Sequence, residues 1–258
     1  NYGIAKASGK PTEAARILEL AWSYGTRIFG TAPRYGSEEV LSRFFKEHGL
    51  GEKALILTKV PPLNDHRQYR SKIESTIYKS VELLHCGAIE VLFFHDPKDS
   101  ELLMNNPPFF ESLLDEYPVS TLGVSVYDPH EVEKLSICGL ELAFQFPFNV
   151  LDRRFEKVMM PAGRRYARSV FLQGLLVSAN GLRPNAPTEL LYRQKEYHDR
   201  LADHFIDPVS FAVSFVARNN AVDYFLIGVD STKQLKDILD LELYEKKEFS
   251  VAVGNRFK

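Results

Sequence analysis

A chain of 258 residues, of which 45% are apolar, is long enough to form one domain with a large core. Its 32 basic and 34 acidic residues nearly cancel and form no dense basic block, so we expect neither nucleic acid nor an anionic membrane surface as a partner. The apolar runs are also much shorter than the roughly 20 residues that a membrane-spanning helix needs. We therefore expect a small, nearly neutral ligand.

Helix-like and strand-like segments alternate along the chain, a pattern typical of a parallel sheet covered by helices. Thr12 is predicted to cap a first helix that ends near Gly25, and Ser37 is predicted to cap a second one. Seven segments have the composition of strands: Arg27 to Thr31, Ala54 to Val60, Ile89 to His95, Thr121 to Tyr127, Glu141 to Pro147, Tyr166 to Phe171 and Asp223 to Val229. Further helices are expected between these strands: Arg67 to His85, Asp99 to Glu116, Pro129 to Cys138, Glu189 to Phe205, Asp207 to Asn219 and Thr232 to Leu239.

Seven strands are one fewer than a closed eight-stranded barrel requires, and an open sheet edge would be costly. We therefore predict an α/β fold, a single (β/α)8 TIM barrel over residues 1–258, and hypothesise that its first strand lies in residues that precede Asn1. The loops after Pro147 and Leu176 are long and rich in Pro, Gly and Asn, so they are predicted to shape a substrate mouth.

The two cysteines, Cys86 and Cys138, lie far apart and lack the spacing of a metal site, which indicates core packing and a reducing, cytoplasmic compartment. A metal-dependent hydrolase would need clustered histidines and carboxylates at strand ends, and His95 with Asp96 does not make such a cluster. We therefore expect no metal. The oligomeric state leaves no signature in the sequence.

Three polar residues lie where parallel barrels carry their chemistry, at the carboxyl ends of the predicted strands. Lys59 closes the run ALILTK, His95 closes EVLFFH, and Tyr35 follows the strand that ends near Thr31. Each alone also fits a structural role, as a lysine with a buried stem, a hydrogen-bonded core histidine or a loop tyrosine that fills a gap. Together they fit carbonyl reduction, because an ammonium lowers the pKa of a neighbouring phenol, which can then protonate an oxygen that an imidazole orients.

The chain resembles the aldo-keto reductase family in several segments that occur in the right order. These segments are GTAPRYGSEE (30–39), LTKV (57–60), FFHDP (93–97), GVSVYDP (123–129), QFPFNVLDRRF (145–155) and RSVFLQGLL (168–176). The resemblance implies NAD(P)H-dependent reduction of an aldehyde or ketone to an alcohol. Tyr35 would donate the proton, Lys59 would lower the pKa of Tyr35, and His95 would position the carbonyl group.

One position departs from the family pattern: the string DTAxxYG reads GTAPRYG, so Gly30 replaces the catalytic aspartate that pairs with the lysine. Without this carboxylate, Lys59 either finds water or another acceptor, or its pKa falls because burial penalises an unpaired ammonium. Glu38 and Asp96 are nearby in the sequence, but no pattern connects them with the lysine. Two hypotheses stay open: a reductase weakened by the loss, and a degenerate barrel that acts as a cofactor-binding, regulatory or structural protein.

The resemblance also implies a nicotinamide dinucleotide that lies extended across the barrel mouth, without a glycine-rich Rossmann turn. It assigns these positions to the cofactor: Ser125, Gln145, Arg168, Leu172, Gly174, Gly228, Asp230, Gln234 and Asp237. Ser125 and Gln145 would hold the carboxamide, and Arg168 would stack on the nicotinamide. The backbone around Leu172 and Gly174 would approach the pyrophosphate, and the helix that opens after Gly228 would favour phosphate at its N-terminus.

The expected cofactor is NADP, and NAD stays open. Asp230 stands where a small polar residue commonly accepts the 2′-phosphate, and like charges repel. Lys233 and Lys236 can compensate, although lysines on such a helix more often form a solvated face. Val126 and Ile238 replace asparagines that usually face the carboxamide and the adenine.

Overall fold

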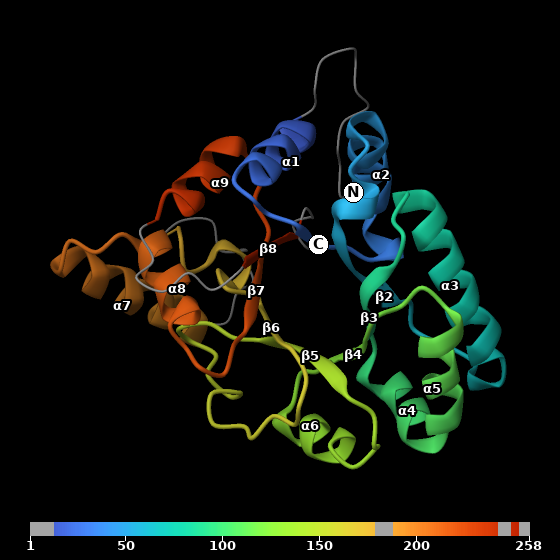
Figure 1. Ribbon diagram of the computed structural model, residues 1–258. Helices are drawn as coiled ribbons and strands as arrows, with labels where there is room; N and C mark the ends of the chain where they lie inside the picture. Colours follow the sequence, from blue (N-terminus) through green and yellow to red (C-terminus); the bar gives the residue numbers. More distant parts are fainter. Residues whose placement is uncertain (1–12, 179–187, 242–248, 253–258) are drawn as a thin grey trace.

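The chain forms a closed barrel of parallel strands with the helices on its outside (Figure 1). The computed structural model describes residues 13–178, 188–241 and 249–252. The strands follow chain order around the barrel: β1 (Ile28–Gly30), β2 (Leu55–Val60), β3 (Ile89–Phe94), β4 (Leu122–Ser125), β5 (Leu142–Pro147), β6 (Arg165–Arg168), β7 (Tyr224–Ile227) and β8 (Phe249–Ala252). Each of the first seven overlaps a predicted strand, and the predicted (β/α)8 fold class is confirmed.

The eighth place in the barrel is taken by β8, a segment in which the sequence predicted no strand. It pairs in parallel with β1, where Gly30 lies opposite Ala252, and with β7, where Ile227 lies opposite Val251. The hypothesis placed the missing strand before Asn1, whereas the structure closes the barrel with this C-terminal segment. The strand has only 4 residues, too few for a clear period of two, and the charged run before it has the composition of a loop.

Helices follow most of the strands and surround the barrel (Figure 1). The α-helices of the described ranges are α1 (Glu13–Ser23), α2 (Ser37–His48), α3 (Tyr69–Leu84), α4 (Glu101–Asn105), α5 (Pro107–Glu116), α6 (Pro129–Leu135), α7 (Thr188–Asp203), α8 (Pro208–Ala217) and α9 (Thr232–Leu239). Short 3-10 helices lie at Pro33–Tyr35, Gly51–Lys53, His66–Gln68, Pro97–Ser100 and Leu172–Gly174. In these ranges, no helix is long and apolar enough to cross a membrane.

Two helix predictions need correction. The single helix predicted from Asp99 to Glu116 is interrupted at Asn106, because a residue that precedes a proline avoids the helical conformation. Ser37 does not cap α2 but is its first residue, since Gly36 takes the cap position. The other predicted cap, Thr12, lies outside the described residues.

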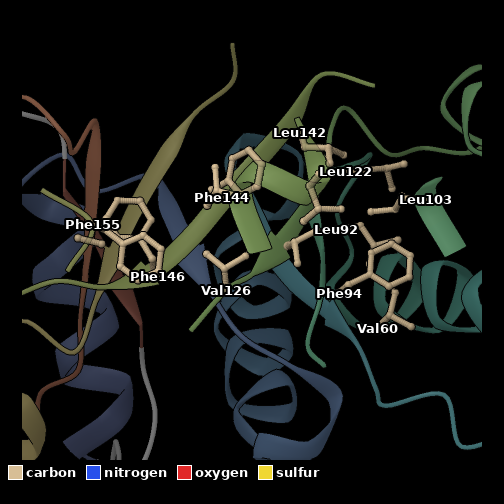
Figure 2. Packing of buried hydrophobic residues seen from close by; sticks show 14 of the residues in the cluster. Val60, Leu92, Phe94, Leu103, Leu122, Val126, Leu142, Phe144, Phe146 and Phe155 are labelled. Carbon is tan, nitrogen blue, oxygen red and sulfur yellow. The ribbon is translucent and has the colours of Figure 1, made fainter. Parts of the chain in front are cut away.

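Most of the core lies between the barrel and the helices. Outward-facing residues of the strands, such as Leu92 and Phe144, pack there in one cluster with Leu103 of α4 (Figure 2). Cys86 and Cys138 are both free and buried in the clusters of this layer, which confirms the prediction of core packing.

A smaller cluster fills the barrel interior. Its buried members are Ile28, Leu57, Val91, Phe93, Ala143, Tyr166 and Leu226. On β4 the inward position is Gly123, where a Cβ would lie 2.6 Å from Cδ1 of Phe93, so the glycine leaves room for that ring. Because side chains alternate along a strand, the residue two positions further along also faces the barrel axis, nearer the carboxyl end. The candidate site is built from that next layer.

Candidate active site

The layer above the interior cluster contains most of the residues that the sequence singles out. Each of them follows an inward-facing residue by two positions: Gly30, Lys59, His95, Ser125, Gln145, Arg168 and Gly228. Lys59 follows Leu57, for example, and His95 follows Phe93. These residues therefore share the carboxyl mouth of the barrel, where parallel barrels carry their active sites.

Tyr35 reaches this mouth from the loop after β1. It ends the 3-10 helix Pro33–Tyr35, and Gly36 follows with a φ of 69°, which lets α2 begin at once. The Tyr35 ring centroid lies 6.2 Å from the imidazole centroid of His95, and Lys59 Nζ lies 5.4 Å from the Tyr35 ring centroid. The phenol, the ammonium and the imidazole thus come together from three separate loops and strands.

Lys59 is buried, and no carboxylate of the described residues pairs with it. The residue is 7% exposed, and its Nζ lies 3.5 Å from the carbonyl oxygen of Thr31. Within the described ranges it forms no ion pair. Burial is the main cause that lowers the pKa of Lys59 from 10.5 to about 8, and the nearby charge of Arg168 is the second. Without the aspartate of the family pattern, the Lys59 ammonium is destabilised by burial, but it stays mostly charged at neutral pH because its pKa is about 8.

Glu38 and Asp96, the two carboxylates singled out in the sequence, do not compensate this lysine. Glu38 lies on the helix side of the sheet, where its Oε1 accepts hydrogen bonds from Thr58 Oγ1 at 3.0 Å and Ser80 Oγ at 3.3 Å. Burial raises the pKa of Glu38. Asp96 caps the 3-10 helix that follows it. Because Thr58 and Lys59 are consecutive in β2, their side chains point to opposite faces, which keeps Glu38 away from Lys59.

His95 has the surroundings of a neutral imidazole. Its Nδ1 is buried and has no hydrogen-bond partner in the part of the chain that the structure describes. Burial is the main cause that lowers the pKa of His95, followed by the positive charge of Lys59. Arg34 and Arg168 act in the same direction, and Asp96 opposes them. A lowered pKa keeps the ring uncharged at neutral pH, where it can still donate one hydrogen bond.

Arg168 ends β6 at the same mouth. Its guanidinium carbon lies 4.2 Å from the centroid of the Tyr127 ring, and its Nη2 donates a hydrogen bond of 3.4 Å to the carbonyl of Val126. Its Nε is buried without a partner among the described residues, and burial is the main cause that lowers the pKa of Arg168. Sequence reasoning missed Tyr127, although a polar aromatic residue just beyond a strand end was a usable signal. Stacking of Arg168 on nicotinamide stays a prediction.

Ser125 and Gln145 lie side by side on β4 and β5. They are register partners and are 1% and 2% exposed. Their side chains form no hydrogen bonds within the described ranges, so a hydroxyl and an amide remain available to a ligand. A carboxamide offers both a donor and an acceptor, which this pair can match. The two residues therefore fit the nicotinamide end of a dinucleotide.

Three of the positions that the resemblance assigns to the cofactor, Asp230, Gln234 and Asp237, lie just before or within α9. Ser231 Oγ accepts a hydrogen bond from the Gln234 amide at 3.2 Å, and Gln234 Oε1 accepts one from the Asp230 amide at 2.8 Å. Asp237 pairs with Lys233 at 2.6 Å. The structure thus brings the predicted residues together, and Lys233 is already paired with a carboxylate.

A second carboxylate, from α1, occupies this helix terminus. Glu13 Oε1 accepts hydrogen bonds from the Thr232 amide at 2.7 Å and from Thr232 Oγ1 at 2.9 Å. These bonds are the main causes that lower the pKa of Glu13. The two residues are 219 positions apart, so sequence reasoning had no signal for the contact. One amide expected to favour phosphate is therefore bound to an anion of the protein itself.

The loop after β6 contains the remaining predicted cofactor positions, Leu172 and Gly174. The consecutive residues Leu172, Gln173 and Gly174 have positive φ angles of 43°, 58° and 91°. Such a left-handed run makes a tight turn, and the Gly174 amide donates a hydrogen bond of 2.9 Å to the carbonyl of Phe171 within it. Contact of this backbone with a pyrophosphate stays a prediction.

The burial of Lys59 predicts how a substitution at this position changes the free energy of unfolding. Lys59→Met is expected to stabilise the folded protein by about 1–3 kcal/mol at neutral pH, because it removes a buried ammonium that has no carboxylate partner among the described residues. The pKa of Lys59 is about 8 in the folded protein and 10.5 ordinarily. The buried ammonium therefore destabilises the folded state fully at pH values below about 8 and no longer does so at pH values above 10.5. Urea denaturation at about pH 7 and about pH 10 should show the variant's advantage shrink at the higher pH.

A matched control for this variant is Lys53→Met. Lys53 is exposed at the end of the 3-10 helix Gly51–Lys53, so the same loss of charge should change the free energy of unfolding by less than about 0.5 kcal/mol. A Lys59→Met protein that is less stable than the wild type at neutral pH would show that the ammonium has a favourable partner.

Comparison with known proteins agrees with this geometry. A model of the aldo/keto reductase family matches residues 1–252. The chain belongs to the aldo-keto reductase family. It is 23% identical over 167 residues to the aldo-keto reductase YhdN of Bacillus subtilis (strain 168), a match that covers 62% of this chain and only 50% of that relative.

Two other relatives match this chain over most of their length. Pyridoxal 4-dehydrogenase of Microbacterium luteolum is 25% identical over 285 residues, which covers 87% of this chain and 82% of that protein. D-threo-aldose 1-dehydrogenase of a Pseudomonas species is 25% identical over 266 residues, 86% and 81% of the two chains. Glycerol dehydrogenase from Gluconobacter oxydans, 21% identical, shares the fold with a TM-score of 0.69 over 88% of this chain and 79% of that one. These relatives are oxidoreductases.

Proposed function

We propose that this protein reduces an aldehyde or ketone to an alcohol with a reduced nicotinamide dinucleotide. The observation that carries the proposal is the cluster of Tyr35, Lys59 and His95 at the barrel mouth. The pair Ser125 and Gln145, with its available hydroxyl and amide, supports a nicotinamide at the same mouth.

The mechanism follows from the charges of the three clustered residues. When bound, a reduced nicotinamide supplies the hydride that the carbonyl carbon accepts. The neutral imidazole of His95 donates a hydrogen bond that orients the carbonyl oxygen. The Tyr35 hydroxyl gives its proton to that oxygen as the C=O double bond becomes a single bond, and the Lys59 ammonium stabilises the phenolate that remains.

The second hypothesis is a barrel that binds a cofactor without turnover. It rests on Gly30 and on the unpaired Lys59. We favour the reductase, because three members of the catalytic group are retained and removal of one member seldom abolishes every part of a group's effect.

Two measurements in sequence distinguish these hypotheses. Fluorescence titration with NADH and NADPH measures cofactor binding, and oxidation of the bound form is then followed with a panel of aldehydes. We expect both binding and turnover. Tight binding with no alcohol formed from any aldehyde would favour the degenerate barrel.

The carboxylates at the start of α9 support NADH over NADPH as the working cofactor. Asp230, and Glu13 on the Thr232 amide, would repel a 2′-phosphate, whereas an unsubstituted ribose has no such conflict. We expect NADH to bind about tenfold more tightly, which corresponds to about 1.4 kcal/mol, and Asp230→Asn to reduce that ratio. Asp240→Asn, at the other end of the same helix, is the matched control. A wild-type preference for NADPH would contradict this choice of cofactor.

A further inference from the structure

Positive charge collects at the barrel mouth, and no carboxylate of the described residues forms an ion pair with Lys59 or Arg168 there. Burial lowers the pKa of Lys59 and of Arg168, and the positive charge of Arg168 lowers the pKa of Lys59 further. Arg34, in the 3-10 helix Pro33–Tyr35, adds a third positive charge toward His95. Within the described ranges, neither Lys59 nor Arg168 forms an ion pair.

The carboxylates in the neighbourhood are already engaged. Both oxygens of Asp152 accept hydrogen bonds of 2.8 Å from Arg154, and Asp96 caps the 3-10 helix that follows β3. Glu38 lies on the other face of the sheet, bound to Thr58. Because unpaired buried cations cost free energy and repel one another, such a site gains most from an anionic ligand.

We propose that the substrate is a carbonyl compound that carries a carboxylate or an equivalent anionic group, held by Arg168 and Lys59 beside the reducing centre. This inference rests on the proposed reductase function and narrows its substrate class. It differs from the nearly neutral ligand expected from composition, because an overall charge balance does not report the local charge of one site.

Arg168 is held in place for this task. Its guanidinium carbon lies over the Tyr127 ring and its Nη2 donates a hydrogen bond to the carbonyl of Val126, so less side-chain freedom remains to be lost when a ligand binds. Its Nε is buried and has no partner in the described residues. Its Nη1 forms no hydrogen bond within the described residues, and the planar fork of a guanidinium matches the two oxygens of a carboxylate.

The binding of an anion should depend on pH through Lys59. The titratable or charged groups that face it are Arg168 from β6, Tyr35 from the loop after β1 and His95 at the end of β3. Since the pKa of Lys59 is about 8, its charge is present below that pH and lost above it. Affinity for an anion should therefore weaken as the pH rises through about 8, and the part due to Arg168 should persist.

The test compares aldehydes that differ only in charge. Glyoxylate, succinic semialdehyde and 4-carboxybenzaldehyde are each paired with their methyl ester, which keeps the aldehyde and removes the carboxylate. We expect the acid of at least one pair to exceed its ester in kcat/KM by about tenfold or more, and Arg168→Gln to bring that ratio to about twofold or less. Arg43→Gln, an exposed arginine on α2, removes the same charge elsewhere and should leave the ratio unchanged.

A binding measurement separates this inference from turnover and from the cofactor's own phosphates. Calorimetric titration compares benzoate with benzamide, with and without saturating NADH. We expect benzoate to bind and benzamide not to bind, and we expect benzoate to bind both without NADH and with saturating NADH. Benzoate that is displaced by NADH would mean that the cations serve the cofactor, and would overturn the inference.

The remaining outcomes distinguish the two proposals. Equal kcat/KM for every acid and ester pair would overturn the anionic substrate and leave the reductase standing. No reduction of either member, together with benzoate binding that Arg168→Gln abolishes, would overturn the reductase and leave an anion-binding site.

Discussion

Tyr35→Phe is expected to lower kcat/KM for aldehyde reduction by about 10²- to 10⁴-fold, the usual contribution of a general acid. The phenylalanine ring can keep its place beside His95, 6.2 Å away between centroids, so the change removes only the hydroxyl. The oxygen formed at the former carbonyl then has no proton donor at this position. Initial rates at saturating NADH measure the loss, and fluorescence titration checks that the cofactor still binds.

The control for this variant is Tyr78→Phe on α3. Tyr78 is 60% exposed and belongs to the outer helix layer, so the same substitution should leave the rate unchanged. A Tyr35→Phe protein that retains the wild-type rate would remove Tyr35 as the acid and require another donor at the mouth.

Gly30→Asp is expected to raise the rate, most strongly at alkaline pH. Gly30 belongs to the same layer as Lys59. Its register partner on β2 is Leu57, which precedes Lys59 by two residues. Because the pKa of Lys59 is about 8, only about a tenth of the lysines remain charged at about pH 9. A carboxylate beside the ammonium would raise that pKa again, so the rate at about pH 9 should rise about tenfold and the rate at neutral pH much less.

The matched variant is Gly30→Asn, which has nearly the same shape without the charge. It should leave the alkaline limb of the pH profile where the wild type has it. Profiles of kcat/KM from about pH 6 to about pH 10 for the three proteins make the comparison. Identical profiles for Gly30→Asp and the wild type would contradict the electrostatic role assigned to Lys59.

Local patterns explain why much of this site could be predicted from the sequence. Along β2 and β3 the inward-facing apolar residues Leu57 and Phe93 are each followed, two positions later, by a polar residue, Lys59 and His95. Strands buried on both faces consist mainly of apolar residues, so polar residues at their carboxyl ends indicated the position of the site. Helix α9 was predicted with the bounds that the structure has, and the structure shows Ser231 as its cap, with a side chain that accepts a hydrogen bond from the Gln234 amide.

The rest depended on contacts between distant parts of the chain. Glu13 accepts a hydrogen bond from Thr232, which is 219 positions away, and no local sequence pattern predicts this contact. Glu38 contacts Thr58 on the helix side of the sheet and so stays away from Lys59, because alternate side chains of β2 face opposite ways. β8 consists of 4 residues that gain their hydrogen bonds only when β1 and β7 are already in place.

Transfer of a labelled hydride tests the central claim most directly. The protein is mixed with NADH that carries deuterium at the transferable position and with the aldehyde that is reduced fastest, and the alcohol is analysed by mass spectrometry. The cluster of Tyr35, Lys59 and His95 predicts an alcohol with one deuterium on the former carbonyl carbon, formed much more slowly by Tyr35→Phe. Bound cofactor with no labelled alcohol, or labelled alcohol formed equally fast without the Tyr35 hydroxyl, would contradict it.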